Sequence, residues 1–187
     1  MLDQGIPVLC VEDEIEISHP LFSSVQGWYD AGRLIAQHLA NILEQQGRIL
    51  CIGGNRTETQ NIDFGRQRLQ GIFDVLSQYP AIELEIVQSY WDYDTALTHL
   101  AGHFEAQDEI LPNAILGLSD SLALACKDAA RSVGWLSKAT KIGGINGEPT
   151  ALSGILKGTF EATVDIRAEE FARQVVSLAR KAAAGES

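Results

Sequence analysis

Basic side chains are scarce in this sequence, which has 14 lysines and arginines against 25 aspartates and glutamates and a formal net charge of −11. A surface this acidic repels the phosphate backbone of nucleic acids and the head groups of anionic lipids. We therefore expect no direct nucleic-acid partner.

Long apolar runs are absent as well. No stretch approaches the ~18–20 apolar residues that a membrane-spanning helix needs. The first ten residues, MLDQGIPVLC, lack the basic region with which a signal peptide begins. We expect neither a membrane span nor a signal peptide in this sequence.

Cysteine is rare, and the three present, Cys10, Cys51 and Cys126, cannot all pair with one another. Two fall in predicted strands and one in a predicted helix, where a thiol serves as a small buried hydrophobe. This usage favours a reducing compartment over a disulfide framework.

What the sequence has is a regular alternation of short apolar runs with amphipathic segments, and 45% of its residues are hydrophobic. The apolar runs predict strands at 7–11, 48–53, 84–88, 114–118, 141–145 and 160–165. The amphipathic segments predict helices at 29–46, 61–78, 93–107, 120–134, 148–158 and 167–184.

The predicted strands are apolar throughout instead of alternating, which indicates that helices bury both of their faces. Repeated strand–helix units predict an α/β fold, a doubly wound parallel sheet with helices on both faces. Gly47, Gly134 and Gly158 are expected to end helices, and Asp92 and Asp120 to cap the helices that follow them.

In open parallel sheets, ligands bind outside the carboxyl ends of the strands. The groups at those ends are polar or aromatic: Glu12 and Asp13, residues 54–57, residues 89–92, Ser119 and Asp120, Asn146 and Gly147, Asp165 and Arg167. Carboxylates and amides bind hydroxyl groups, and aromatic faces cover the apolar side of a sugar ring. This edge is therefore predicted to bind a hydroxyl-rich small molecule.

The acidic pair Glu12 and Asp13 after an apolar run is also how a phosphorylation receiver domain begins. A receiver further needs an Asp at the end of a later strand, then a Ser or Thr at a strand end, and a Lys at the last strand. The next strand here ends in glycines and Asn55, and Lys141 opens its strand instead of closing it. The receiver interpretation is therefore disfavoured.

Ser119 in GLSDS lies close to the nucleophile-elbow pattern of hydrolases. The final Gly of that pattern is replaced by Ser121, and all four histidines precede Ser119, so the usual order of the triad fails. A turn-forming or ligand-facing Ser119 beside a capping Asp120 is favoured over a catalytic serine.

His99 and His103 have the four-residue spacing of a zinc pair, but no third ligand is evident, and no metal or cofactor is expected. Arg66 and Arg68 form a solvated helix face by default. In the alternative interpretation, one arginine anchors a ligand at the start of the helix and the other ties the helix to the sheet.

The order of several motifs resembles the type I periplasmic-binding-protein superfamily over nearly the whole chain. The motifs are AGRLIAQHL (31–39), GRQRLQG (65–71), SDSLALA (119–125) and GING (144–147). This superfamily includes ribose- and galactose-type sugar receptors and the effector-binding cores of lactose-repressor-like regulators.

The resemblance implies two α/β lobes that grip a ligand between them. On that pattern, residues 1–23 end the first lobe and cross over, residues 24–164 form the second lobe, and residues 165–187 cross back as a helix to the first lobe. Most of the first lobe is then absent from this sequence and becomes an expected partner.

Carried over position by position, Arg66 matches the family's ligand-contacting arginine. Glu12 stands where ribose receptors have Asp, Asp13 where they have Arg, Ser119 where Asn is common, Asn146 where Asp is common, Ile166 where Gln is common, and Trp28 where Asn is common. These departures argue against ribose itself and leave a small polar ligand, with a monosaccharide preferred.

We therefore predict a non-enzymatic binding domain of a solute receptor or sensor for sugar transport or signalling. The ligand contacts are predicted to be Asp13, Arg66, Trp91, Ser119, Asn146 and Asp165, with Tyr90 as an alternative stacking partner. The alternative is the effector-binding core of a lactose-repressor-like transcription regulator.

The expected partners follow from the same resemblance: a transporter, a kinase or a DNA-binding head. The family favours an extracytoplasmic location, and the three unpaired cysteines favour a cytoplasmic one. The apolar stripe Phe171, Val175, Val176 and Leu178 has to be covered by its own lobe, by the absent lobe or by a second copy in a homodimer.

Overall fold

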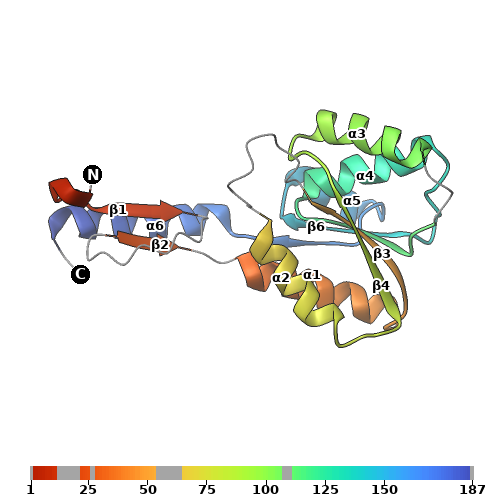
Figure 1. Ribbon diagram of the computed structural model, residues 1–187, viewed down its shortest axis with the longest axis horizontal. Coiled ribbons are helices and arrows are strands. Elements are labelled where there is room, and N and C mark those ends of the chain that lie inside the picture. Colours follow the sequence, from red (N-terminus) through yellow and green to blue (C-terminus); the bar gives the residue numbers. More distant parts are fainter. Residues whose placement is uncertain (1, 12–21, 26–27, 54–64, 107–110, 186–187) are drawn as a thin grey trace. The chain divides into compact units, whose positions relative to one another are not determined.

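The computed structural model describes residues 2–11, 22–25, 28–53, 65–106 and 111–185. The chain divides into two compact units, a terminal unit of residues 1–28 and 167–187 and a central unit of residues 29–166. Figure 1 shows the elements of both units. In the part of the chain described here, no helix combines the length and the apolar character needed to cross a membrane.

The central unit is built on a five-stranded sheet in which all pairs of neighbours are parallel. In spatial order its strands are β4 (Ile82–Gln88), β3 (Gly47–Gly53), β5 (Ala114–Gly117), β6 (Lys141–Asn146) and β7 (Ala162–Asp165). This order places the first strand of the unit between the second and the third, which is the flavodoxin-like arrangement of a doubly wound sheet. The predicted fold class is confirmed.

Helices cover both faces of this sheet (Figure 1). They are α1 (Trp28–Ile42), α2 (Arg66–Leu76), α3 (Tyr93–Glu105), α4 (Asp120–Ser132) and α5 (Pro149–Leu156). Helices α1 and α2 lie on one face and α3 and α4 on the other, as right-handed crossovers from an internal first strand require. The strands β3 and β5 are buried under both layers, with Ile49, Cys51, Ile115 and Leu116 fully enclosed.

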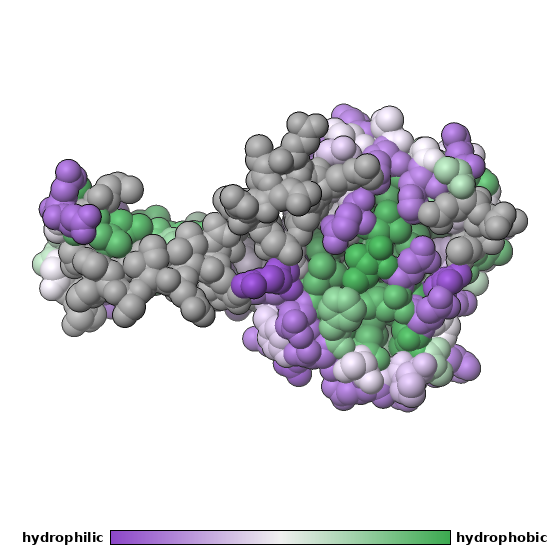
Figure 2. Space-filling model, in the orientation of Figure 1, coloured by the Kyte–Doolittle hydropathy of each residue, from purple (hydrophilic) through white to green (hydrophobic). Residues whose placement is uncertain are grey.

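Edge strand β4 is less enclosed than the others. Its Leu84 and Ile86 are only partly buried, and Phe73 on the adjacent helix α2 is 45% exposed. Figure 2 shows hydrophobic residues gathered over the region where β4 runs in Figure 1, with hydrophilic residues around them.

Two glycines allow α1 and α2 to approach closely. A Cβ atom on Gly32 would lie 2.0 Å from the backbone oxygen of Arg68, and one on Gly71 would lie 2.1 Å from that of Tyr29. No side chain fits at these distances, so each helix presents a glycine to the backbone of the other. This contact fixes the start of α2, which carries Arg66 and Arg68.

Most predicted boundaries agree with the structure to within a few residues, and the exceptions have local causes. The helix predicted over 29–46 ends at Ile42. Glu44 and Gln45, which follow it, have φ angles of 53° and 62°, and this left-handed conformation cannot continue a right-handed helix. Residues 61–64 of the helix predicted over 61–78 lie outside the described residues.

The terminal unit contains the 3₁₀ turn Leu2–Gln4, β1 (Val8–Val11), β2 (Phe22–Val25) and α6 (Ala168–Ala184). Strands β1 and β2 pair in parallel, and α6 lies against β1. Strand β2 was not predicted, because FSSV is short and carries two serines. Phe171 on α6 packs on Trp28 with ring centroids 6.0 Å apart, whereas Val176 and Leu178 are 50% and 43% exposed. That its own lobe, the absent lobe or a second copy covers Val176 and Leu178 stays a prediction.

Candidate functional site

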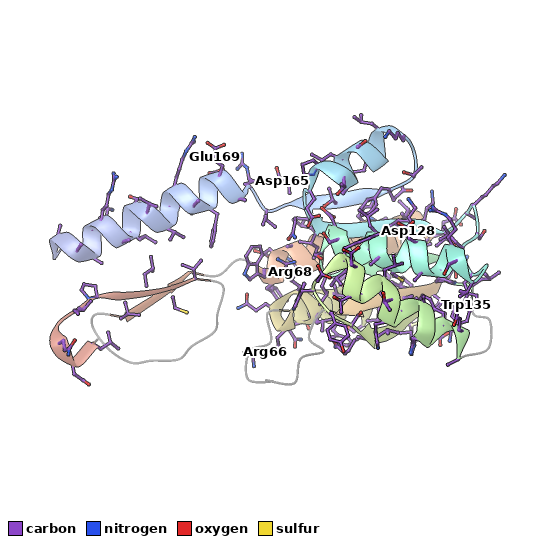
Figure 3. The ribbon with its side chains drawn as sticks, turned by 90° about the horizontal axis from the view of Figure 1, so that it is seen from above. Arg66, Arg68, Asp128, Trp135, Asp165 and Glu169 are labelled. Atoms are coloured by element: carbon purple, nitrogen blue, oxygen red, sulfur yellow. The ribbon has the colours of Figure 1, made fainter. Side chains whose placement is uncertain are left out.

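The carboxyl ends of the five parallel strands meet at one edge of the central sheet. The strand order reverses between β3 and β5, and this switch point is where open α/β sheets bind ligands. Figure 3 shows Arg66, Arg68 and Asp165 at this end of the central unit and Trp135 at the opposite end. Residues 54–64, which follow β3, and the predicted contact Asp13 lie outside the described residues.

Arg68 ties α2 to the end of β5. The residue is 92% buried, and its guanidinium donates a hydrogen bond to the backbone oxygen of Leu118. The centre of the same guanidinium lies 6.0 Å from the centroid of the Trp91 ring, within the range of a cation–π contact. One of the two arginines therefore joins helix to sheet, as the alternative interpretation of this pair proposed.

Arg66 begins α2 and is exposed, in contrast to Arg68 two residues later. Because α2 starts at the carboxyl edge, Arg66 is positioned at the edge where its role as a ligand contact was predicted. Tyr90 and Trp91 are both partly buried, and Tyr90 packs edge-to-face on His99, with ring centroids 5.6 Å apart. The choice between these two predicted stacking partners stays a prediction.

Ser119 is the N-cap of α4, and the prediction that Asp120 caps this helix is wrong. The Ser119 Oγ accepts a hydrogen bond from the backbone nitrogen of Leu122 at 3.2 Å, and the residue is 95% buried. A serine engaged with the backbone in this way is a structural cap. The catalytic-serine interpretation receives no histidine partner among the contacts of the described residues.

Asp120 instead joins three elements at the edge. Its carboxylate is fully buried and accepts hydrogen bonds from the Glu148 backbone nitrogen at 2.7 Å and from the Thr163 hydroxyl at 2.7 Å. Burial, followed by the charge of Glu148, raises the pKa of Asp120, while the hydrogen bonds that it accepts partly offset this rise. A Cβ on Gly144 would lie 2.2 Å from the Asp120 Oδ1, so this glycine makes room for the carboxylate.

The Glu148 carboxylate connects the end of β6 with the start of α4. It accepts hydrogen bonds from Ser121 Oγ at 2.8 Å and from Asn146 Nδ2 at 3.1 Å. Sequence reasoning missed Glu148 and Thr163. The available signal for Glu148 was its place directly before Pro149, which occupies the first turn of α5 and marks Glu148 as a helix start.

Asn146 holds an unusual position at this edge. Its φ of 127° is a conformation that side chains rarely adopt, and its amide nitrogen is held by Glu148. Its Oδ1 is buried and has no hydrogen-bond partner within the described part of the chain. Asn146 pairs in register with Asp165 on β7, whose side chain is exposed. An amide acceptor and a carboxylate therefore lie on neighbouring strand ends.

The histidine pair does not form a metal centre with other described residues. The His99 and His103 rings stack with centroids 6.3 Å apart, and His99 Nδ1 is 3.2 Å from the Ser89 Oγ. No group of three or more His, Cys, Asp or Glu side chains suited to a metal ion occurs among the residues that the structure describes.

Comparison with known proteins gives one family and a set of similar folds. The family model for the periplasmic binding protein domain matches residues 1–187. No curated protein sequence matches the chain.

Three solved structures illustrate the similarity. An ABC transporter periplasmic solute-binding protein from Actinobacillus succinogenes 130z, with bound D-allose, is 21% identical with a TM-score of 0.79, covering 99% of this chain and 66% of its own. The Caulobacter myo-inositol-binding protein, bound to myo-inositol, is 24% identical with a TM-score of 0.82, covering 100% of this chain and 63% of its own. The fructose-binding periplasmic domain of the hybrid two-component system BT1754 is 21% identical with a TM-score of 0.79, covering 100% of this chain and 60% of its own. The chain thus spans less than two thirds of the length of these structures.

Proposed function

The chain belongs to the periplasmic binding protein domain family, a family of non-enzymatic solute-binding proteins, and on that basis we propose that it binds a monosaccharide or a cyclic polyol at the carboxyl edge of its central sheet. Two of the similar structures contain bound D-allose or myo-inositol, and the third is a fructose-binding domain. These three polyols share a ring with adjacent hydroxyl groups.

The observation that carries the proposal is the unpaired Asn146 Oδ1. A buried acceptor without a partner costs free energy, on the order of 1–3 kcal/mol. A hydroxyl group of a bound sugar would satisfy it at the strand end where ligands of parallel sheets bind.

The remaining predicted contacts supply complementary chemistry. Arg66 provides donors and Asp165 provides acceptors, so together with Asn146 they match hydroxyls that both donate and accept. The ring of Trp91 offers an apolar face for the C–H side of a sugar. Asp13 and Ser119 remain proposed contacts, although the hydroxyl of Ser119 already caps α4.

We further propose that a second lobe completes the binding site. Residues 24–164 would form one lobe, and residues 1–23 and 165–187 would lead to the other, with an ABC transporter or a sensor kinase reading the closure. The alternative role, the effector-binding core of a lactose-repressor-like regulator, stays a prediction. Because one lobe makes only part of the contacts, the isolated chain is expected to bind weakly.

Titration of the chain with D-allose, D-fructose and myo-inositol, followed by NMR, tests the proposal. At least one of them, at concentrations up to about 10 mM, is expected to shift the side-chain signals of Trp91 and Asn146. The Arg66→Ala variant should abolish the shifts, whereas Arg33→Ala, which removes another exposed arginine of the same unit, should leave them unchanged.

The proposal is overturned if none of the three polyols moves either signal. It is also overturned if Arg66→Ala and Arg33→Ala bind as the native chain does, since Arg66 would then make no contact.

A further inference from the structure

A second candidate site lies at the opposite edge of the central sheet, where the strands begin. An open cavity of about 400 Å³ is bordered by the last turns of α4, the start of β6 and the segment before β7. This volume falls within the range of small-molecule sites. The cavity is remote from the carboxyl edge, since Lys141 opens β6 whereas Asn146 closes it.

The charge around this cavity is inverted relative to the rest of the chain. Its lining contains Lys127, Arg131, Lys138 and Lys141 but only one carboxylate, Glu161. These are four of the 14 basic residues in a chain of net charge −11. Clustering of scarce cations around a concave surface focuses a positive potential there, which attracts anions.

Lys127 is the most enclosed of these cations, with 9% of its surface exposed. Its ammonium donates a hydrogen bond to the backbone oxygen of Thr159 at 3.0 Å, a partner that carries no charge. Burial and then repulsion by Arg131 lower the pKa of Lys127, and Asp128 offsets this only in part. An ammonium held in this way is stabilised when an anion approaches.

The other cations are compensated to different degrees. Arg131 forms an ion pair with Asp128 at 2.8 Å, and Lys141 forms one with Glu161 at 3.0 Å. Lys138 is exposed and forms no ion pair with another described residue. Even when Asp128, which lies outside the lining, is counted together with Glu161, four positive charges face two negative ones.

The dipole of α4 explains only part of this arrangement. Lys127 and Arg131 lie in the last turns of the helix, where cations are favoured by its partial negative charge. Lys138 and Lys141 belong to the following loop and to β6, beyond the reach of that effect. Cations from separate elements therefore converge on one cavity, and this convergence indicates a site for an anionic ligand.

We propose that this cavity binds a phosphate group, either as the free anion or as part of a small phosphomonoester. A phosphate carries close to two negative charges at neutral pH and accepts several hydrogen bonds at once. Ammonium and guanidinium donors provide such bonds. The Ser137 Oγ accepts from the backbone nitrogen of Ala139 at 3.1 Å, which leaves its hydroxyl hydrogen to donate.

The test is a pair of NMR titrations of the full chain, with inorganic phosphate and with glycerol 3-phosphate, at constant ionic strength set by chloride. Backbone amides of residues 127–142 and 158–161 are expected to shift with saturation. The Lys127→Ala variant should weaken binding about tenfold, the effect of losing one charge-assisted hydrogen bond.

Lys157→Ala is the matched control, because Lys157 is exposed on the same unit and lies outside the lining. It should leave the affinity unchanged. Lys138→Ala, at an exposed loop position, gives a second variant that is expected to fold even if Lys127→Ala does not. Tighter binding of glycerol 3-phosphate would identify a monoester as the ligand, and equal binding would identify the free anion.

The proposal is overturned if neither titrant gives chemical-shift changes that saturate, or if chloride alone gives the same changes. It is overturned equally if Lys157→Ala weakens binding as much as Lys138→Ala, because a diffuse charge effect would then account for it. Sugar binding at the opposite edge does not enter this measurement, so either proposal can fail alone.

Discussion

The guanidinium of Arg68 donates a hydrogen bond to the backbone oxygen of Leu118, a residue 50 positions later in the chain. This bond joins the start of α2, where Arg66 lies, to the end of β5, where the Ser119 cap begins α4. Two predicted contact positions that are distant in sequence are thereby fixed relative to each other.

Replacing Arg68 by alanine is expected to destabilise the chain by about 2–3 kcal/mol, because the buried oxygen of Leu118 loses its charged donor. Urea unfolding gives the free energy of unfolding for comparison with the native chain. Lys157→Ala, at an exposed position of the same unit, is the control and should change it by less than about 0.5 kcal/mol. Equal losses in the two variants would contradict a special role for Arg68.

The Gly71→Ala change is expected to destabilise the chain by about 1–3 kcal/mol, because the new Cβ would lie 2.1 Å from the Tyr29 backbone oxygen and force α1 and α2 apart. Gly102→Ala is the matched control within helix α3, where a Cβ meets nothing within 4 Å. That variant should be more stable than the native chain by up to about 1 kcal/mol. Thermal unfolding of the three proteins decides the matter, and a stable Gly71→Ala variant would refute the close helix contact.

The buried Asp120 is expected to make stability depend on pH in a defined direction. Since its pKa is raised above the ordinary value of 3.8, the folded chain holds this proton more tightly than the unfolded chain. The stabilisation is complete below the ordinary value and is lost as the pH rises through the raised pKa.

Asp120→Asn lacks this titration, so the unfolding midpoint of the native chain should decline relative to that of the variant as the pH rises from about 4. Thermal unfolding of both proteins at a series of pH values measures this difference. A difference that is constant with pH would show that Asp120 keeps its ordinary pKa in the folded chain.

Cys10 is expected to react with a thiol reagent well before Cys51 and Cys126 at pH 8. Cys51 and Cys126 are fully buried, and burial raises the pKa of the Cys51 thiol to about 12 and that of the Cys126 thiol as well, so almost no thiolate forms. Cys10 in β1 is only partly buried. A colorimetric thiol assay with mass spectrometry should find one modified cysteine in the folded chain and three after denaturation. Rapid modification of Cys51 would contradict the packing of β3.

The strand ends that make up the candidate site were predictable from the sequence, but the hydrogen bonds that join them were not. The strand-end rule placed Ser119, Asn146 and Asp165 at one edge, because parallel strands all point the same way. Arg66, at the start of α2, was named only from the family resemblance. The rule could not show that Arg68 reaches Leu118, or that Asp120 bonds Glu148 and Thr163, since these partners lie 28 to 50 residues apart. The sequence-based choice of Asp120 as the cap of α4 was wrong, because Ser and Asp both suit a helix start and only the structure shows that Ser119 holds that position.

The sequence alone determined the α/β class, the strands of the central sheet and the helices between them, because apolar periodicity and glycine or proline signals act over a few residues. It left out β2, whose four residues become a strand only by pairing with β1. Tertiary structure decided which polar groups are buried together and which cations converge on one cavity. Those relations depend on contacts between distant segments, and no local pattern of residues encodes them.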